Sequence, residues 1–361
     1  MRDWCPGCTL TSAITSVELA KPSGIPSTPD EWAADASSHL PAPAMAGGSL
    51  RRLQMFTGVV VTWNSAAEIP ALVGSVSQHL ADRCRLLFVD NASTDETVEM
   101  IEEHSPDSRL IALPRNVGFG PANNLGVREA DTEVVALLNP DTVMVDASLA
   151  ELAALASQMR ALLAPRLLND DGTPQISAFP PVAGWESGLI SIWPGFLLPR
   201  RVRARCEPWR YDERLTAGWL SGACLMARRQ LLLELGPFDE ALALYGEDTD
   251  LGLRASRLEI PSIFAPDIAR IVHLGNRSGE QAFDDRGARR KIDARRWIVR
   301  TRVGRLRAGY DLISQILLHA LRWIAKVVVR RDASSERIWL RAAVRSIRER
   351  PPADREPEGR G

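Results

Sequence analysis

The alternation of apolar runs and amphipathic stretches after residue 57 constrains the fold more than any other feature of the sequence. Each apolar run is short and rich in Val, Leu and Ile, as in strands that are buried on both faces. Such alternation predicts an α/β fold, with a mostly parallel sheet and helices on both of its faces. The predicted strands are TGVVVTW (57–63), RLLFVD (85–90), RLIALP (109–114) and EVVALLNPD (133–141), and the stretches between them are 67–80, 93–104 and 120–130.

Polar side chains follow each predicted strand at the point where it ends. The carboxyl ends of parallel strands meet at one edge of a sheet, where ligands of α/β proteins bind. One such residue alone would indicate a turn, but four groups together predict a binding crevice. These residues are Asn64, Asp90, Asn91, Arg115, Asn116 and the run from Asn139 to Asp141.

Composition divides the chain into three parts. Residues 1–52 are rich in Pro, Ser, Ala and Gly, which is typical of a disordered extension. Residues 53–279 hold the predicted α/β domain, in which 180–217 looks irregular, 218–240 reads as a strand and then a helix, and 261–275 as one or two short strands. Residues 280–361 are basic and mainly helical.

The apolar residues between Leu312 and Val328 fit one face of a helix, but charged residues interrupt them and make this stretch too polar to span a bilayer. Two interpretations stay open for it: an accessory helix packed on the core, or an interfacial helix held on acidic lipid through arginine.

Bulk properties exclude some classes of function. The formal net charge of the 361 residues is −1, so there is no global attraction to nucleic acid. Cys5 and Cys8 form a single C-x-x-C pair without the second pair that a structural zinc site needs. An odd count of five cysteines and the lack of a signal-peptide pattern predict the reducing cytoplasm. Peripheral contact with the inner face of the cell membrane stays open.

Each polar group has a structural interpretation beside its functional one. Asp90 could accept hydrogen bonds from a sugar or a base, or cap the following helix. Gly118 precedes a helix start that could meet a phosphate, although the G-x-G-x-x-G and P-loop spacings are missing. Asp141 could bind a hard cation beside a diphosphate, or belong to an Asn-Pro-Asp turn. His273 could complete a metal site with Asp141 if the two lie close in space.

The stretch YGEDTDLGLR places three acids at the start of a predicted helix over 247–257. Asp250 would pair with Arg254 one turn later, and Glu247 would lie in the first turn, where the helix dipole favours an acid. Asp248 has no cation at the positions three and four residues later. This unpaired carboxylate is therefore the best candidate among the three for a general base.

The ordered motifs VVVTWNS, FVDNASTDET, RNVGFGPANNLGV, LLNPD, GACLMARR, GPFDE, YGEDTDLGLRA and VHLGNRS resemble the family 2 glycosyltransferases, most closely their rhamnosyltransferase-like branch. The resemblance covers about residues 57–279 and implies a GT-A (Rossmann-like) fold. It implies that Asp248 is the catalytic base. It also implies that Thr62, Asn64, Asp90, Asn91, Asn116, Gly118 and Asn139 bind the nucleotide sugar, that Trp219, Ser221, Gly222 and Glu247 line the acceptor side, and that Asp141 and His273 bind Mg²⁺ or Mn²⁺.

One departure concerns the metal. Asn139 stands where many relatives have the first Asp of a D-x-D motif, so one negative charge near the diphosphate is missing. Even so, the resemblance implies an inverting glycosyltransferase: the metal would stabilise the departing nucleotide diphosphate, and Asp248 would deprotonate the attacking hydroxyl.

The leading expectation is rhamnose transfer, with dTDP-rhamnose or a UDP-sugar as donor. The acceptor would be a glycan or a polyprenyl-linked glycolipid in cell-wall or surface polysaccharide synthesis. The alternatives are a catalytically inactive nucleotide-sugar binding protein and a sugar-1-phosphate nucleotidyltransferase. The latter would want a Gly-rich loop and a basic residue near the first strand, and VVVTWNSAAE has neither.

Overall fold

A computed structural model describes residues 55–240, 242, 246–275 and 285–348. The expectation of a disordered extension over 1–52 lies outside the described residues. Of the described helices, none is long and apolar enough to cross a membrane.

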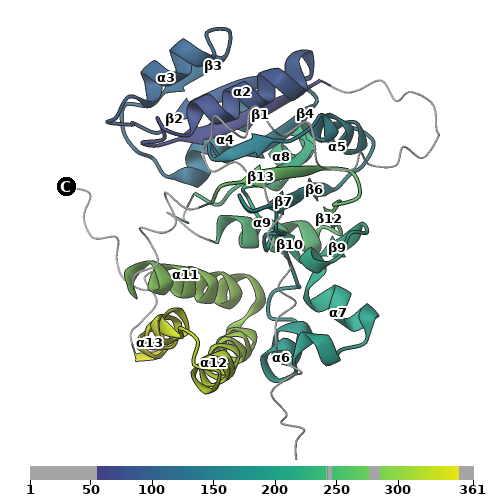
Figure 1. The fold of residues 1–361 in the computed structure, drawn as a ribbon, viewed down its shortest axis with the longest axis vertical. Coiled ribbons are helices and arrows are strands. Elements are labelled where there is room, and N and C mark those ends of the chain that lie inside the picture. The colour runs from purple at the N-terminus through teal and green to yellow at the C-terminus, as the bar shows by residue number, and fades with distance from the viewer. Residues whose placement is uncertain (1–54, 241, 243–245, 276–284, 349–361) are drawn as a thin grey trace, which may run out of the picture.

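An eight-stranded sheet forms the centre of the molecule, in the order β3-β2-β1-β4-β11-β6-β12-β9 (Figure 1). Strands β3, β2, β1 and β4 are parallel, and β11 enters antiparallel between β4 and β6. The four predicted strands are therefore confirmed. The bounds are β1 Phe56–Thr62, β2 Cys84–Asp90, β3 Arg109–Ala112, β4 Val134–Leu138, β6 Leu162–Ala164, β9 Leu215–Ala217, β11 Cys224–Arg228 and β12 Ser262–Phe264.

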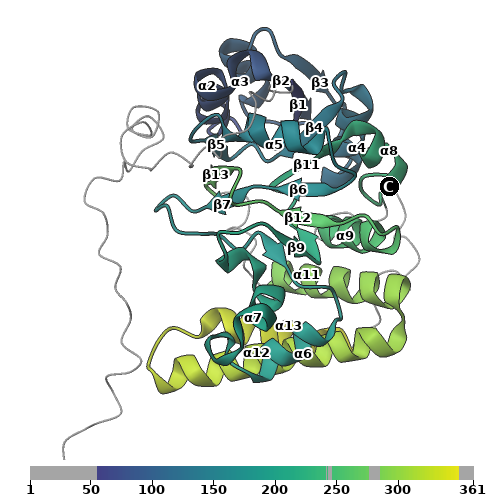
Figure 2. The ribbon, with the colours of Figure 1, turned by 90° about the vertical axis from the view of Figure 1, so that its right-hand side faces the viewer.

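Helices cover both faces of the sheet, as predicted (Figure 2). Alternate strand residues point to opposite faces, so Val60 packs with α2, α3 and α5, whereas Val59 packs with α4, α8 and α9. These helices span Ile69–Leu80 (α2), Thr97–His104 (α3), Phe119–Glu129 (α4), Ser148–Ala156 (α5), Arg229–Leu235 (α8) and Glu247–Arg257 (α9).

Two small sheets lie beside the main one. Strand β13 (Arg270–His273) pairs antiparallel with β5 (Thr142–Met144) and parallel with β7 (Arg166–Leu168). Strand β10 (Trp219–Leu220) pairs antiparallel with β8 (Ala178–Phe179). The first small sheet matters for the site, because it carries residues from 142 and from 273 to the same place.

Residues 180–217 are more regular than the sequence suggests. They contain α6 (Trp185–Ile192), α7 (Arg200–Cys206), the one-turn helices η2 (Gly195–Leu197) and η3 (Pro208–Arg210), and β9. The expectation of an irregular segment is therefore wrong. The prolines lie between these elements or in the first turn of one, where they do not interrupt a helix.

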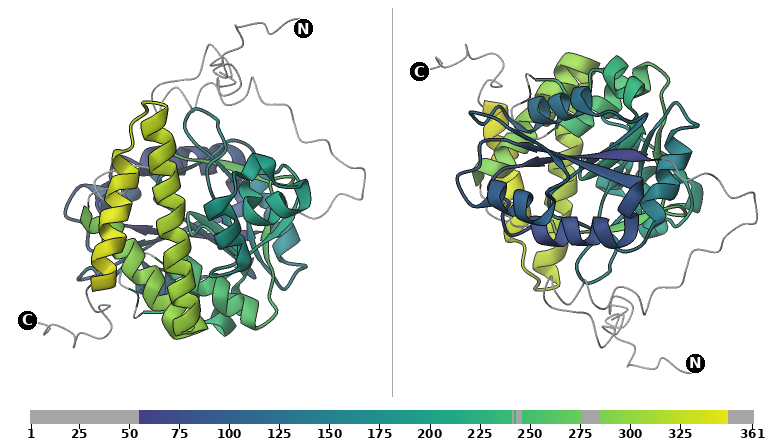
Figure 3. Two further views of the ribbon diagram at one scale, coloured as in Figure 1. Left: turned by 90° about the horizontal axis from the view of Figure 1, so that it is seen from below. Right: turned by 90° about the horizontal axis from the view of Figure 1, so that it is seen from above.

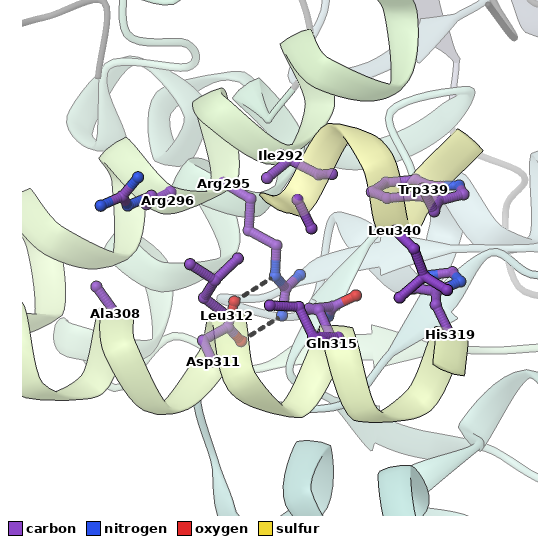
Figure 4. A pocket seen from close by; sticks show the side chains of 12 residues that line it. Ile292, Arg295, Arg296, Ala308, Asp311, Leu312, Gln315, His319, Trp339 and Leu340 are labelled. Atoms are coloured by element: carbon purple, nitrogen blue, oxygen red, sulfur yellow. Dashed lines mark hydrogen bonds and ion pairs between the residues drawn. The ribbon is translucent and has the colours of Figure 1, made fainter. Parts of the chain in front are cut away.

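The described residues of the C-terminal region, 285–348, are mainly helical and form a layer at one end of the molecule (Figure 2). Helix α12 packs against α6, α11 and α13. Inside this layer, Arg295 of α11 donates two hydrogen bonds of 2.7 and 2.8 Å to Asp311 of α12, and the His319 ring stacks on Trp339 of α13 (Figure 4). The bounds are α11 Asp285–Ile298, the π-helical turn η4 Val299–Val303, α12 Arg305–Val328 and α13 Ser334–Arg348.

Candidate active site

The carboxyl ends of β1 and β2 meet through side chains. Thr62 and Asp90 are direct partners in the ladder. The Thr62 hydroxyl donates to Asp90 Oδ1 at 2.9 Å, and Ser93 donates to the same carboxylate through its hydroxyl and its backbone N–H. Asp90 is 2% exposed. Its carboxylate therefore organises the loop that follows β2, which also explains why α3 begins at Thr97 rather than at the predicted residue 93.

Asparagine side chains form hydrogen bonds between the loops at the same edge of the sheet. Asn64, with a positive φ of 52°, accepts a 2.8 Å hydrogen bond from the Thr94 N–H. Asn91 donates to Asn116 Oδ1 at 3.0 Å, and that oxygen also accepts from the Gly118 N–H at 2.9 Å. Six of the seven residues predicted to bind the nucleotide sugar thus form two hydrogen-bonded clusters, and the seventh, Asn139, lies beside His273. Gly118, with φ of 97°, turns the chain into α4.

Asp141 and His273 lie together, although 132 positions separate them in the sequence. The cause is the backbone: His273 pairs with Thr142 in the β13–β5 ladder, and the Leu274 N–H donates to the Asp141 carbonyl at 2.9 Å. His273 Nε2 is 3.3 Å from Asp141 Oδ1 and 3.2 Å from Asn139 Nδ2. The structure therefore satisfies the condition that the sequence left open for these two residues.

Gln175 orients this histidine and escaped the sequence analysis. Its Oε1 lies 2.7 Å from His273 Nδ1, and because an amide oxygen only accepts, Nδ1 is the donor in this pairing. In the neutral ring, Nε2 then accepts from Asn139 Nδ2 at 3.2 Å and also lies 3.3 Å from Asp141 Oδ1. Two acceptors 3.3 Å apart are stabilised by a cation between or beside them, and an oriented second ring nitrogen is typical of metal-ligating histidines.

The donor set is small. Among the described residues, no group of three or more His, Cys, Asp or Glu side chains gathers as a metal site. One carboxylate and one imidazole fit Mg²⁺ or Mn²⁺ in a site where a diphosphate and water supply the other ligands.

Asp248 and Glu247 form a carboxylate pair at the start of α9. Asp248 accepts from the Thr249 N–H at 2.7 Å and from the Gly222 N–H at 3.4 Å. Burial raises the pKa of Asp248. Burial and then the charge of Asp248 raise the pKa of Glu247 to about 7, and its buried Oε2 has no hydrogen-bond partner among the described residues. Such a pair can hold or release a proton near neutral pH.

The predicted acceptor-side residues adjoin this pair to different degrees. Gly222 contacts Asp248 directly, and Ser221 stands beside it in the turn between β10 and β11. Trp219 stacks on Phe179, with ring centroids 3.7 Å apart, and packs so closely on α9 that a Cβ at Gly252 would lie 2.4 Å from it. Trp219 therefore packs against α9 at Gly252, in addition to any contact with an acceptor.

The C-terminal region also reaches this site, through residues that the sequence analysis did not select. Asp250 is fully buried and pairs at 2.7 Å with Arg254, as predicted, and at the same distance with Arg302 of η4. Lys291 of α11 interacts electrostatically with Asp248, while its burial lowers its pKa. The contacts of Asp250 with Arg302 and of Asp248 with Lys291 join residues more than 40 positions apart, so no local sequence pattern could reveal them.

The carboxylate pair is joined to the metal-type donors by the main sheet. Strand β11 follows the Gly222 turn and pairs antiparallel with β4, and the Asn139 N–H donates to the Ala223 carbonyl at 2.9 Å. The groups predicted to bind a nucleotide, a metal and an acceptor thus lie at one edge of the sheet, and the binding crevice itself stays a prediction.

Comparisons with known proteins agree with this architecture. Residues 57–183 match the model of glycosyl transferase family 2. A Mycobacterium tuberculosis protein named N-acetylglucosaminyl-diphospho-decaprenol L-rhamnosyltransferase is 29% identical over 238 residues, which cover 61% of this chain and 76% of that protein.

Two solved structures are similar in fold, each with a TM-score of 0.51. GalNAc-T7 with UDP, GalNAc and Mn²⁺ is 19% identical, over 67% of this chain and 48% of that chain. The mannosyltransferase PcManGT from Pyrobaculum calidifontis, with GDP-Man and Mn²⁺, is 16% identical, over 82% of this chain and 88% of that chain. At these identities the likeness concerns the fold alone, which is GT-A.

Proposed function

The chain belongs to family 2 of the glycosyltransferases, in the rhamnosyltransferase-like branch, and from this premise we propose that it transfers a sugar with inversion from a nucleotide diphosphate to an acceptor hydroxyl. The observation that carries the proposal is the Glu247–Asp248 pair. Asp248 of this pair accepts a hydrogen bond from the Gly222 N–H. The next residue, Ala223, accepts one from the N–H of Asn139. Asn139 is close to Asp141 and His273, which lie 3.3 Å apart.

The donor nucleotide would bind at the ends of β1 and β2. Thr62 and Asp90 hold the loop, and Asn64, Asn91, Asn116 and Gly118 present amide and backbone groups at the edge of the sheet. Asn139 would meet the diphosphate as a neutral donor beside Asp141.

Asp141 and His273 would hold a divalent cation, Mg²⁺ or Mn²⁺, with Gln175 fixing the histidine ring. When bound, such a cation offsets the negative charge that builds up on the leaving nucleotide diphosphate.

Asp248 would act on the acceptor. Its carboxylate accepts the proton of the attacking hydroxyl, which then displaces the nucleotide diphosphate from the opposite face of the sugar. The raised pKa of Asp248 suits this role, because a base with a pKa nearer neutrality takes a proton more readily. Ser221, Gly222, Trp219 and Glu247 would shape the acceptor side.

The donor and acceptor follow the named relative. The name of that relative supports rhamnose as the leading sugar and a polyprenyl-linked glycan as the leading acceptor. We propose dTDP-rhamnose as the donor, with a UDP-sugar as the alternative, in cell-wall or surface polysaccharide synthesis. A glycolipid acceptor would place the enzyme in the cytoplasm, at the acidic inner face of the membrane.

The test is Asp248→Asn, with donor binding and transfer measured separately. Transfer should fall at least about a thousandfold, because the base is lost. Binding is followed by thermal stabilisation with dTDP-rhamnose, UDP-glucose, UDP-galactose or GDP-mannose, with and without Mn²⁺. A donor at 100 times its Kd adds about 2.7 kcal/mol.

The matched control is Asp131→Asn, an exposed carboxylate that precedes β4 at the opposite end of the strands. It should leave transfer unchanged. Near-normal transfer by Asp248→Asn would remove Asp248 from the mechanism. If the unmodified protein binds a donor but shows neither transfer nor donor hydrolysis, the result would instead favour an inactive nucleotide-sugar binding protein.

A further inference from the structure

The outward face of α12 is apolar. Six side chains that recur every three to seven residues are between 41% and 93% exposed, and they form one stripe along the helix. They are Leu306, Ile313, Leu317, Leu321, Ile324 and Val328. A surface helix of a globular protein normally turns this kind of stripe inward.

Two polar side chains of α12, Asp311 and His319, point inward instead. Asp311 is 3% exposed and receives both hydrogen bonds of Arg295. His319 pairs with Glu336 of α13 at 2.5 Å. These contacts fix the rotation of the helix about its axis. These buried contacts of Asp311 and His319 therefore keep the apolar stripe of α12 on the solvent-facing side of the helix.

Helix α6 extends the apolar surface. It lies along α12, with Ser191 donating to the Ser314 carbonyl at 2.7 Å and the Gly188 N–H donating to the Tyr310 hydroxyl at 3.0 Å. The chain then leaves α6 with four exposed apolar side chains in six residues. They are Ile192 (66%), Trp193 (51%), Phe196 (74%) and Leu197 (57%). Aromatic and aliphatic side chains together suit the boundary between lipid headgroups and acyl chains.

Positive charge surrounds this surface. Between residues 305 and 347 the sequence has nine Arg and Lys and three Asp and Glu, whereas the whole chain has a net charge of −1. Two of the three acids, Asp311 and Glu336, are buried in ion pairs within the helical layer. The exposed side chains of α12 and α13 are therefore almost all apolar or cationic, and the two helices lie side by side across this end of the molecule (Figure 3).

A groove combines both properties at the start of α12. Trp185 and Leu306 provide its apolar lining, and Arg305 and Arg307 lie beside them. An apolar wall next to guanidinium groups fits the boundary between an acyl chain and an anionic headgroup.

We propose that the exposed faces of α6, η2 and α12, flanked by the arginines of α12 and α13, dock this protein in the plane of an anionic lipid bilayer. The apolar stripe enters the headgroup region, and the arginines contact lipid phosphates. A second copy of the chain fits this surface less well, because a symmetric contact would bring the same arginines face to face.

The experiment is flotation of the full chain with vesicles, in the absence of sugar donor and acceptor. Vesicles of phosphatidylglycerol and phosphatidylcholine in equal parts should bind the protein, vesicles of phosphatidylcholine alone should bind it much more weakly, and added salt should weaken the anionic case. Leu321→Gln should reduce binding about tenfold, and Arg337→Glu about fivefold or more.

Matched controls come from the end of α9, where Leu258 and Arg257 are also exposed. Leu258→Gln and Arg257→Glu should bind vesicles like the unmodified protein, and circular dichroism should show that all four variants fold.

The proposal is overturned if neither vesicle binds the protein, or if the α12 and α9 variants behave alike. It is also overturned if light scattering shows a dimer that Leu321→Gln dissociates, because the stripe would then be covered by a second copy. Vesicle binding and sugar transfer are separate measurements, so failure of one leaves the other intact.

Discussion

Glu247 is the least satisfied side chain of the candidate site. Its Oε2 is buried with no hydrogen-bond partner in the part of the chain that the structure describes, and the neighbouring Asp248 adds a like charge. Keeping such a group lowers the stability of the folded chain. Unfavourable groups of this kind are concentrated at functional sites, where an acceptor hydroxyl or a proton can satisfy them.

A dependence of stability on pH follows from Glu247. Its pKa is about 7 in the folded protein and 4.5 in a free side chain. Between these values the folded protein holds a proton that the unfolded chain has released, so stability falls as the pH rises through this range. Glu247→Gln lacks this contribution. The melting temperature of Glu247→Gln minus that of the unmodified protein should therefore increase as the pH rises from about 4.5 to about 7.

The control is Glu102→Gln, an exposed side chain on α3. Its melting curve should run parallel to that of the unmodified protein at every pH. A Glu247→Gln curve that also runs parallel would show that Glu247 titrates normally.

At this scale the sequence predicted what is local. It separated Asp248 from Asp250, because the partner of Asp250, Arg254, lies one turn along the same helix. It could not find Arg302, Gln175 or Lys291, because they contact the acids or the histidine only through tertiary packing.

One acid of helix α9, Asp250, joins this helix to two other parts of the chain. Asp250 joins Arg254 to Arg302, and Arg254 also donates to the carbonyls of Gly236 at 2.7 Å and Pro237 at 2.9 Å. The turn after α8, the start of α9 and the turn η4 therefore meet at one carboxylate. The position of Asp248, two residues earlier, depends on this connection.

Asp250→Asn should destabilise the protein by about 3 kcal/mol, because two guanidinium groups lose a fully buried charged partner. The melting temperature should fall by roughly 5 °C or more. Thermal denaturation measures this, with Asp131→Asn as the control, since Asp131 pairs with Arg85 on the surface and 63% of its side chain is exposed. Equal melting temperatures for the two variants would show that α9 is held by other contacts.

Elements with strong periodicity were predictable, and short elements were not. The β1, β2 and β4 strands and α9 match the predictions within a few residues. Strands β8 and β10 have two residues each, too few to show a period, and they form because Trp219 stacks on Phe179. Helices α6 and α7 were missed because prolines surround them, and their packing on α12 and β9 is tertiary.

At the scale of the whole molecule, the helical layer and the sheet domain meet beside the carboxylate pair. Gly246 precedes Glu247 with a φ of 95°, and a Cβ placed there would lie 2.6 Å from Ile298 Cδ1 and 3.5 Å from Ala294 Cβ of α11. We therefore expect the C-terminal region to affect catalysis as well as docking, although its boundary with the domain near residue 280 stays a prediction.

Gly246→Ala should cost about 3 kcal/mol or more, since backbone strain and the contact with α11 add together. It should also lower transfer, because the added methyl group presses on Ile298 directly before the Glu247–Asp248 pair. The control is Gly172→Ala: φ is 76° there, but no atom lies within 4 Å of the added Cβ, so only the backbone strain of about 1 kcal/mol remains. Thermal denaturation and a transfer assay on both variants measure this. Equal losses of stability and transfer in the two variants would indicate that the side chains of α11 move aside at no measurable cost.

The β13–β5 ladder has a consequence for how the chain acquires its function during folding. Asn139 and His273 are 134 positions apart, and Gln175 is 98 positions from His273. Contacts between such distant residues close large loops, and they form slowly compared with helices and local turns. We therefore expect Asp141 and His273 to come together late in folding, after the local helices and turns. A partly folded chain would then lack the proposed cation site even where its helices have already formed.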